Sequence, residues 1–256
     1  MSDTTKPTTP FGVGAIIGNT FTVWLRNIIP IFLASIIPQI VVYGVMLLLF
    51  GADVLLSQTP APGNEAQYFI GTIALSVLGL VAAAITTAIV VRIAYDSFSG
   101  RPVSIGAAIS GALPHILPIA VLSFAAALAV GVGALLLIIP GLYLYAMWSV
   151  AAPAIVVERA GFSGLGRSAA LTKHYRWPII GTLFLLGIII IVISLIVGAI
   201  VTAIAVGGGI IAAVILQLVL YSLMYGPFYV VIAMIYARLR ELKEGVVVQD
   251  LADVFS

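Results

Sequence analysis

The chain has no cysteine and little charge, with 11 Lys and Arg, 9 Asp and Glu and 2 His among 256 residues. The lack of cysteine excludes disulfides, thiolate metal sites and cysteine nucleophiles. Charged residues make up 8% of the chain and apolar residues 62%, and the mean hydropathy is +1.26. A water-soluble domain needs far more polar residues to cover its surface. The composition therefore predicts an integral membrane protein.

Lysine and arginine are absent from three long stretches, residues 27–91, 102–158 and 177–237. Each stretch can hold two helices of about 20 residues, the length that crosses a hydrocarbon core of about 30 Å. Basic residues gather in the cytoplasmic loops of membrane proteins. We therefore expect an all-α, multi-pass protein whose six transmembrane helices form three hairpins, with both termini in the cytoplasm.

The apolar runs give the bounds of the six spans. We expect them at Ile28–Phe50, Tyr68–Val91, Leu117–Ile139, Leu142–Val157, Pro178–Ala203 and Ile210–Ala237. Pro140 and Gly141 favour a tight turn between the third and fourth spans. Gly226-Pro227 should kink the last span, because proline removes a backbone donor. The fourth span is short and contains Pro153, so whether it crosses fully stays open.

A segment with glycine near its start and helical periodicity precedes each hairpin. The three segments are Phe11–Pro30, Val103–Pro118 and Phe162–Pro178. In the first, apolar residues recur at the spacing of an amphipathic helix lying in the membrane interface. Ser104 and Ser163 are the expected N-caps of the other two. We interpret the chain as three tandem units, each an interfacial helix followed by a hairpin; shared interface chemistry without a true repeat is the alternative.

Several motifs occur in a fixed order in the second half of the chain. Residues 136–158 read LLIIPGLYLYAMWSVAAPAIVVE, and Gly166-Arg167-Ser168, Leu171-Thr172-Lys173, Arg176-Trp177 and the closing YARLRELKEG at 236–245 follow. This pattern resembles the glycerophosphoryl diester phosphodiesterase membrane domain and related uncharacterised bacterial six-span proteins. The chain departs from it at Ala169, where that family commonly has an aromatic residue. The resemblance implies a bacterial inner-membrane protein.

We expect no enzymatic activity. In full-length members of that family, hydrolysis belongs to a soluble barrel after the membrane part, whereas a cytoplasmic tail of 18 residues, 239–256, follows the last span here. Acid–base or metal catalysis needs several convergent carboxylates or histidines, and His115 and His174 both fall at interface positions. We therefore expect one transmembrane domain over residues 1–256, a disordered tail at 1–10, and no cofactor, metal or nucleic acid.

The densest basic group consists of Arg167, Lys173, His174 and Arg176. We expect these four residues to contact anionic lipid headgroups. We also expect a structural ion pair between Glu158 and Arg159, with Arg167 and Arg176 as alternative partners of the carboxylate. The sequence thus favours a non-catalytic membrane scaffold or accessory subunit, which binds lipid headgroups and also a membrane-protein partner or a second copy of itself.

Transport of a small solute or a lipid through kinked helices is the alternative function. It depends on polar residues inside the spans, namely Gln39, Thr86, Thr87, Gln217, Tyr221, Ser222 and Tyr225. Polar groups in this position are costly and often functional. Each of them also suits a hydrogen bond between helices, worth about 1 kcal/mol. No charged residue lies in the middle of a span, which argues against ion coupling.

Overall fold

The computed structural model describes residues 11–51, 63–207 and 209–245, and all regular structure in these residues is helical. The expected tail at 1–10 and most of the loop between the first two spans lie outside these ranges. The α-helices are α1 (Val13–Arg26), α2 (Ile28–Phe50), α4 (Glu65–Phe98), α5 (Ile105–Ala112), α6 (Ile116–Leu136), α7 (Ile138–Trp148), α8 (Ala151–Glu158), α9 (Gly164–Thr172), α10 (Arg176–Val206), α11 (Ile210–Met224) and α12 (Gly226–Glu244). Short 3-10 helices at Leu113–His115 and Gly161–Ser163 precede α6 and α9.

Six helical segments of the described residues are long and apolar enough to cross a membrane. They are Ile28–Phe50, Glu65–Phe98, Ile105–Leu136, Ile138–Glu158, Arg176–Val206 and Ile210–Glu244. The fold is therefore that of an all-helical, multi-pass membrane protein. The first segment has the bounds expected from the sequence. The second extends beyond its expected bounds because polar residues at both ends continue the helix, and the fifth begins at Arg176 and runs to Val206.

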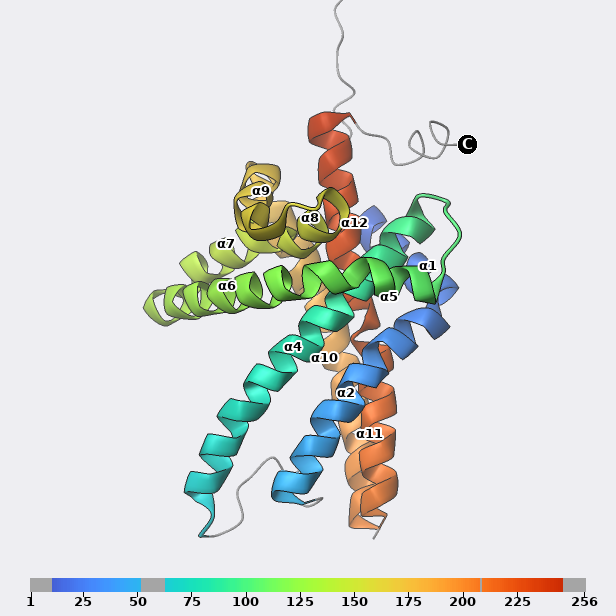
Figure 1. The fold of residues 1–256 in the computed structure, drawn as a ribbon, viewed down its shortest axis with the longest axis vertical. Coiled ribbons are helices and arrows are strands. Elements are labelled where there is room, and N and C mark those ends of the chain that lie inside the picture. Colours follow the sequence, from blue (N-terminus) through green and yellow to red (C-terminus); the bar gives the residue numbers. More distant parts are fainter. Residues whose placement is uncertain (1–10, 52–62, 208, 246–256) are drawn as a thin grey trace, which may run out of the picture.

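Consecutive long helices pack against each other in the pairs α2 with α4, α6 with α7 and α10 with α11. The pairs do not share one direction. Figure 1 shows α10 and α11 along the long axis of the molecule and α2 and α4 slanting toward the same end, whereas α6 and α7 project sideways. The end of the α6–α7 pair is apolar and exposed, with Leu135 88% and Ile138 72% accessible.

The prediction of a turn at Pro140 and Gly141 is wrong, because both residues lie in α7. The chain reverses at Leu137, whose backbone is extended (φ −157°, ψ 138°), and Pro140 lies within the first turn of α7. Proline is tolerated there because the first backbone N–H groups of a helix have no partner within it. Gly141 serves helix packing instead, because a Cβ atom on it would lie 2.8 Å from the Cα of Ala134 on α6.

The fourth and sixth segments are both interrupted. α7 and α8 are separated at Ser149 and Val150, so that α7 by itself rises about 16 Å at 1.5 Å per residue. The last segment breaks at Tyr225, next to Gly226-Pro227, as the sequence predicts. Beyond the break, α12 continues to Glu244, so the expected tail at 239–256 begins as helix.

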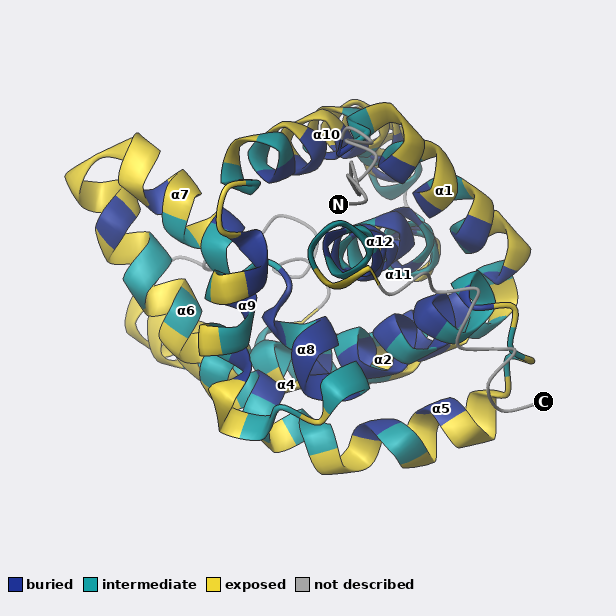
Figure 2. Ribbon diagram, turned by 90° about the horizontal axis from the view of Figure 1, so that it is seen from above, coloured by how far each residue is buried: buried dark blue, intermediate teal, exposed yellow. Residues whose placement is uncertain are grey.

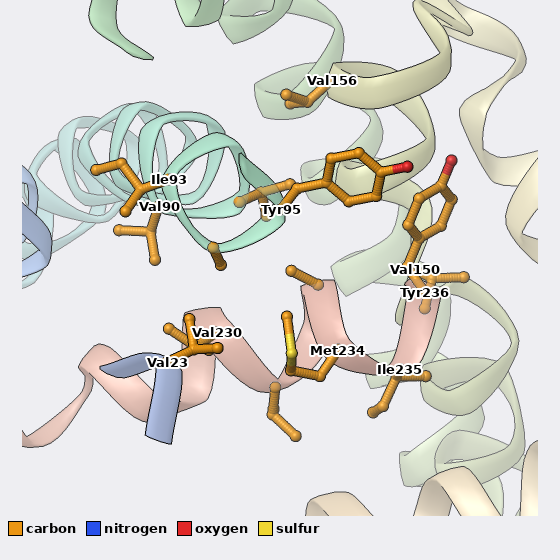
Figure 3. Packing of buried hydrophobic residues seen from close by; sticks show 14 of the residues in the cluster. Val23, Val90, Ile93, Tyr95, Val150, Val156, Val230, Met234, Ile235 and Tyr236 are labelled. Carbon is orange, nitrogen blue, oxygen red and sulfur yellow. The ribbon is translucent and has the colours of Figure 1, made fainter. Parts of the chain in front are cut away.

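α12 forms the centre of the molecule at the end where α9 lies. Seen from that end, α1, α10, α9 and α8 lie around it, and α5 lies farther out (Figure 2). Its buried side chains include Val230, Met234 and Tyr236, which pack with residues of α1, α4 and α8 in one apolar core. Figure 3 shows Tyr95 of α4 reaching toward Tyr236, and their ring centroids are 6.2 Å apart.

The helices expected before each hairpin are α1, α5 and α9. Ser104 caps α5, since its side chain accepts a hydrogen bond from the Ala107 N–H. Ser163 stands at the N-cap position of α9 but makes no capping bond, because its hydroxyl donates to the Ala160 carbonyl instead. α1 and α9 pack against α12, and α5 packs against α4. The end of the molecule where these helices lie is called the basic side and is defined by Arg92, Arg167 and Arg240.

Candidate functional site

The motifs of the second half of the chain fold against one another on the basic side. α9 packs on the end of α7, where Ser168 Oγ and Thr172 Oγ1 both donate to the Met147 carbonyl, at 2.8 and 3.1 Å. The break after α7 removes the helical partners of carbonyls near its end. The serine and threonine of α9 thus replace lost backbone hydrogen bonds and fix α9 to α7.

Glu158 at the end of α8 joins three helices. Its carboxylate accepts hydrogen bonds from Arg167 Nε at 2.6 Å, Arg167 Nη2 at 2.9 Å and the Tyr236 hydroxyl at 2.7 Å. Arg167 also pairs with Glu244, which accepts a 2.8 Å hydrogen bond from Arg240. Hydrogen bonds to the two carboxylates, chiefly that to Glu158, hold the pKa of Arg167 above its usual value.

The expected partner Arg159 is not joined to Glu158 by any ion pair among the described residues. Arg159 has a left-handed backbone (φ 56°) at the C-cap of α8 and is exposed. The chain therefore turns after Glu158. Because α9 then runs back past the end of α8, Arg167 lies beside the Glu158 carboxylate and pairs with it. Tyr236, Arg240 and Glu244 were not expected at this site; the closing YARLRELKEG motif is the sequence signal that could have found them.

The four residues expected to contact headgroups divide into two pairs. Arg167 is held by carboxylates, and Arg176 lies 4.4 Å from the Tyr143 ring centroid and donates a hydrogen bond to the Tyr143 hydroxyl. Lys173 and His174 are exposed in the α9–α10 connection, and neither makes a hydrogen bond or ion pair within the described part of the chain. The exposed Lys173 and His174 therefore keep the better access to a headgroup.

A cavity of about 440 Å³ lies beside this cluster, between α4, α6, α7, α8 and α12. Its wall is made mainly of Ala, Val, Leu and Ile side chains, with Tyr145 and Trp148 of α7. On α6 the wall includes Ser123, Ala127 and Gly131, which recur every fourth residue and are exposed. The cavity therefore opens along the α6 surface, and its small side chains leave room for a long apolar group.

Basic groups stand one helical turn from this cavity. Arg159 follows the lining residue Ile155 by four positions, and His115 precedes the lining residue Ile119 by four, a rise of about 6 Å along each helix. His115 is also within electrostatic range of Arg159 and Arg92. Arg92 is paired with Asp96 at 2.9 Å, so Arg159 is the exposed, unpaired cation of this group among the described residues.

The polar residues that suggested transport are gathered largely into a second cavity. Gln39, Thr86, Tyr221, Ser222 and Tyr225 line it, together with Ser35 and Tyr229. Two expected residues lie elsewhere: Thr87 lines the apolar cavity, and Gln217 is buried on α11.

No group of three or more His, Asp or Glu side chains that could hold a metal ion occurs within residues 11–51, 63–207 and 209–245. The chain matches no protein-family model, no curated protein and no solved structure with which it was compared.

Proposed function

We propose that this chain is a non-catalytic protein of the bacterial inner membrane, a scaffold or accessory subunit that binds an anionic phospholipid at its basic side. The resemblance to the glycerophosphoryl diester phosphodiesterase membrane domain belongs to this proposal, as does a cytoplasmic location of both termini. The observation that carries the proposal is the open apolar cavity, with His115 and with Arg159, which has no ion-pair partner in the described part of the chain, one turn beyond its lining.

The size and chemistry of the cavity suit an acyl chain. Ligand pockets commonly measure about 300–1,000 Å³ and are mostly apolar. With a chain against Ser123, Ala127 and Gly131, the phosphate of the same lipid would lie toward Arg159, where a cation near the membrane surface attracts an anionic lipid by about 1 kcal/mol. Lys173 and His174, beside Trp177 with 65% exposure, offer a second headgroup contact.

Lipid retention by the purified protein tests this proposal. Native mass spectrometry would measure bound lipid after extraction from vesicles that contain equal amounts of phosphatidylglycerol and phosphatidylcholine. We expect phosphatidylglycerol to be retained, and Arg159→Gln with His115→Gln to lower its retention several-fold. Arg26→Gln is the matched control, because Arg26 ends α1, which lies away from α6 and α9 (Figure 2).

A cavity-filling variant tests the acyl-chain contact without changing the charge of Arg159 or His115. Gly131→Leu should displace the lipid without strain, since a Cβ atom at Gly131 meets nothing within 4 Å. Equal retention of both lipids, or retention unchanged in both variants, would contradict the proposal. The same spectra report the mass of any partner subunit or second copy, which the scaffold role requires.

A further inference from the structure

The second cavity, of about 230 Å³, lies where α2, α4, α11 and α12 meet. All seven of its lining side chains carry a hydroxyl or an amide, and none carries a charge. It shares no lining residue with the apolar cavity. A ligand bound in this second cavity would therefore not contact the lining of the proposed lipid site.

This polar cavity lies near the middle of α2 and at the break between α11 and α12, inside the sixth apolar segment. Gln39 is about 16 Å along α2 from Ile28, in a helix about 35 Å long. Tyr225 is about 22 Å from Ile210 along α11. In a hydrocarbon core about 30 Å thick, these positions are close to the midplane, where polar side chains are expensive and usually have a function.

Two of the helices around the cavity carry a proline. Pro227, at the start of α12, lacks an N–H, so the carbonyl four residues earlier loses its helical donor and α11 ends at Met224. Pro38 lies inside α2, next to Gln39. Interrupted helices at membrane depth are tolerated where they line a cavity, and in transporters they form the substrate site.

One fully buried hydroxyl in the lining has no hydrogen-bond partner among the described residues. Ser35 donates to the Ile31 carbonyl at 2.8 Å, and Thr86 donates to the Ala34 carbonyl at 3.3 Å, so both are satisfied by backbone. Ser222 is 4% exposed, and its Oγ makes no hydrogen bond within the described residues. Buried polar groups are nearly always hydrogen-bonded. The unpaired hydroxyl of Ser222 therefore points to a ligand.

We propose that this cavity binds a small uncharged molecule with several hydroxyl groups. Such a molecule can both donate to and accept from Ser222 and Gln39. The rings of Tyr221 and Tyr225, 6.1 Å apart and edge to face, provide apolar surface for its C–H groups. At about 30 Å³ for each water, the cavity has the volume of about eight waters, which suits a polyol of two to four carbons. Ions are disfavoured, because no lining side chain would neutralise them.

Binding of polyols to the full chain in lipid nanodiscs tests this proposal. Saturation-transfer NMR would measure ethylene glycol, glycerol and erythritol, with lactate as an anionic probe of similar size. We expect the polyols to bind and lactate not to bind. Ser222→Ala should weaken polyol binding about 5- to 10-fold, the loss expected for one hydrogen bond.

Stability measurements distinguish a lost ligand contact from misfolding. Because the Ser222 hydroxyl is unpaired, Ser222→Ala should leave the melting temperature without polyol unchanged or raise it. Thr72→Val is the matched control, since Thr72 is exposed on α4 and bonds the Tyr68 carbonyl of its own helix. Absence of polyol binding, equal binding of lactate, or unchanged affinity in Ser222→Ala would overturn the proposal. Polyol binding should persist in the Arg159→Gln and His115→Gln variant.

Discussion

The ion-pair partner of Glu158 is determined by the fold and not by its neighbour in the sequence. Adjacent residues on a helix do not face each other, so Arg159 was poorly placed to neutralise it. The left-handed turn at Arg159 redirects the chain, and α9 returns Arg167 to the carboxylate. Tyr236 adds a hydrogen bond from the central helix. The motifs that contain Glu158, Arg167 and Tyr236 therefore have a structural role, which is to tie α8, α9 and α12 together.

Substitution Glu158→Gln should destabilise the protein by about 2 kcal/mol, because it removes a charged acceptor of three hydrogen bonds in a partly buried site. Thermal unfolding in detergent measures the loss. Glu241→Gln is the control: Glu241 pairs with Arg238 at i,i+3, and its side chain is 41% exposed, so we expect a loss of about 0.5 kcal/mol. Equal losses would show that the Glu158 cluster contributes no more than a surface pair.

The α6–α7 hairpin depends on close approach of the two helices. Gly133 and Gly141 face each other across it, and a Cβ atom at Gly133 would lie 3.3 Å from the Gly141 Cα. Small residues at such a contact let helix backbones approach within a membrane, where van der Waals packing drives association. The Pro-Gly pair therefore belongs to the packing of α7, and the extended residue Leu137 makes the turn.

Substitution Gly141→Val should separate α6 from α7 and destabilise the protein by about 3 kcal/mol, the upper part of the usual range for overpacking. Thermal unfolding in detergent would detect it. Gly198→Val on α10 is a matched control, because a Cβ atom there meets nothing within 4 Å and valine is acceptable in a membrane helix. A melting temperature equal to that of the control variant would mean that the hairpin tolerates separation.

At the scale of the whole molecule, the helices α2, α4, α10 and α11 extend toward one end, whereas the α6–α7 hairpin projects sideways (Figure 1). The end of that hairpin is a run of five exposed apolar residues, Leu135–Ile139. A surface of this kind avoids water. We therefore expect the end of the α6–α7 hairpin to stay within the hydrocarbon layer.

Cysteine labelling tests this arrangement, since the native chain contains no cysteine. A membrane-impermeant maleimide should label Asn64→Cys from outside intact cells and Lys173→Cys in inverted vesicles. Leu137→Cys should react in neither preparation. Labelling of Leu137→Cys from outside would show that the α6–α7 hairpin crosses completely, and labelling of Asn64→Cys only in inverted vesicles would reverse the proposed orientation.

The sequence alone determined the all-helical membrane class, the first span at Ile28–Phe50 and the break at Gly226-Pro227. These features depend on local hydropathy and on the chemistry of single residues, which need no knowledge of contacts. It also singled out most of the polar residues that line the second cavity, although it could not bring them together.

The tertiary structure decided which residues meet. It paired Glu158 with Arg167 and placed Gly141 at the contact between α6 and α7. It also brought Gln39 of α2 and Ser222 of α11 into one cavity. Neighbours from distant helices depend on crossing angles and turn geometry, which the apolar pattern of a membrane chain leaves unspecified, because lipid-facing and protein-facing positions are both apolar.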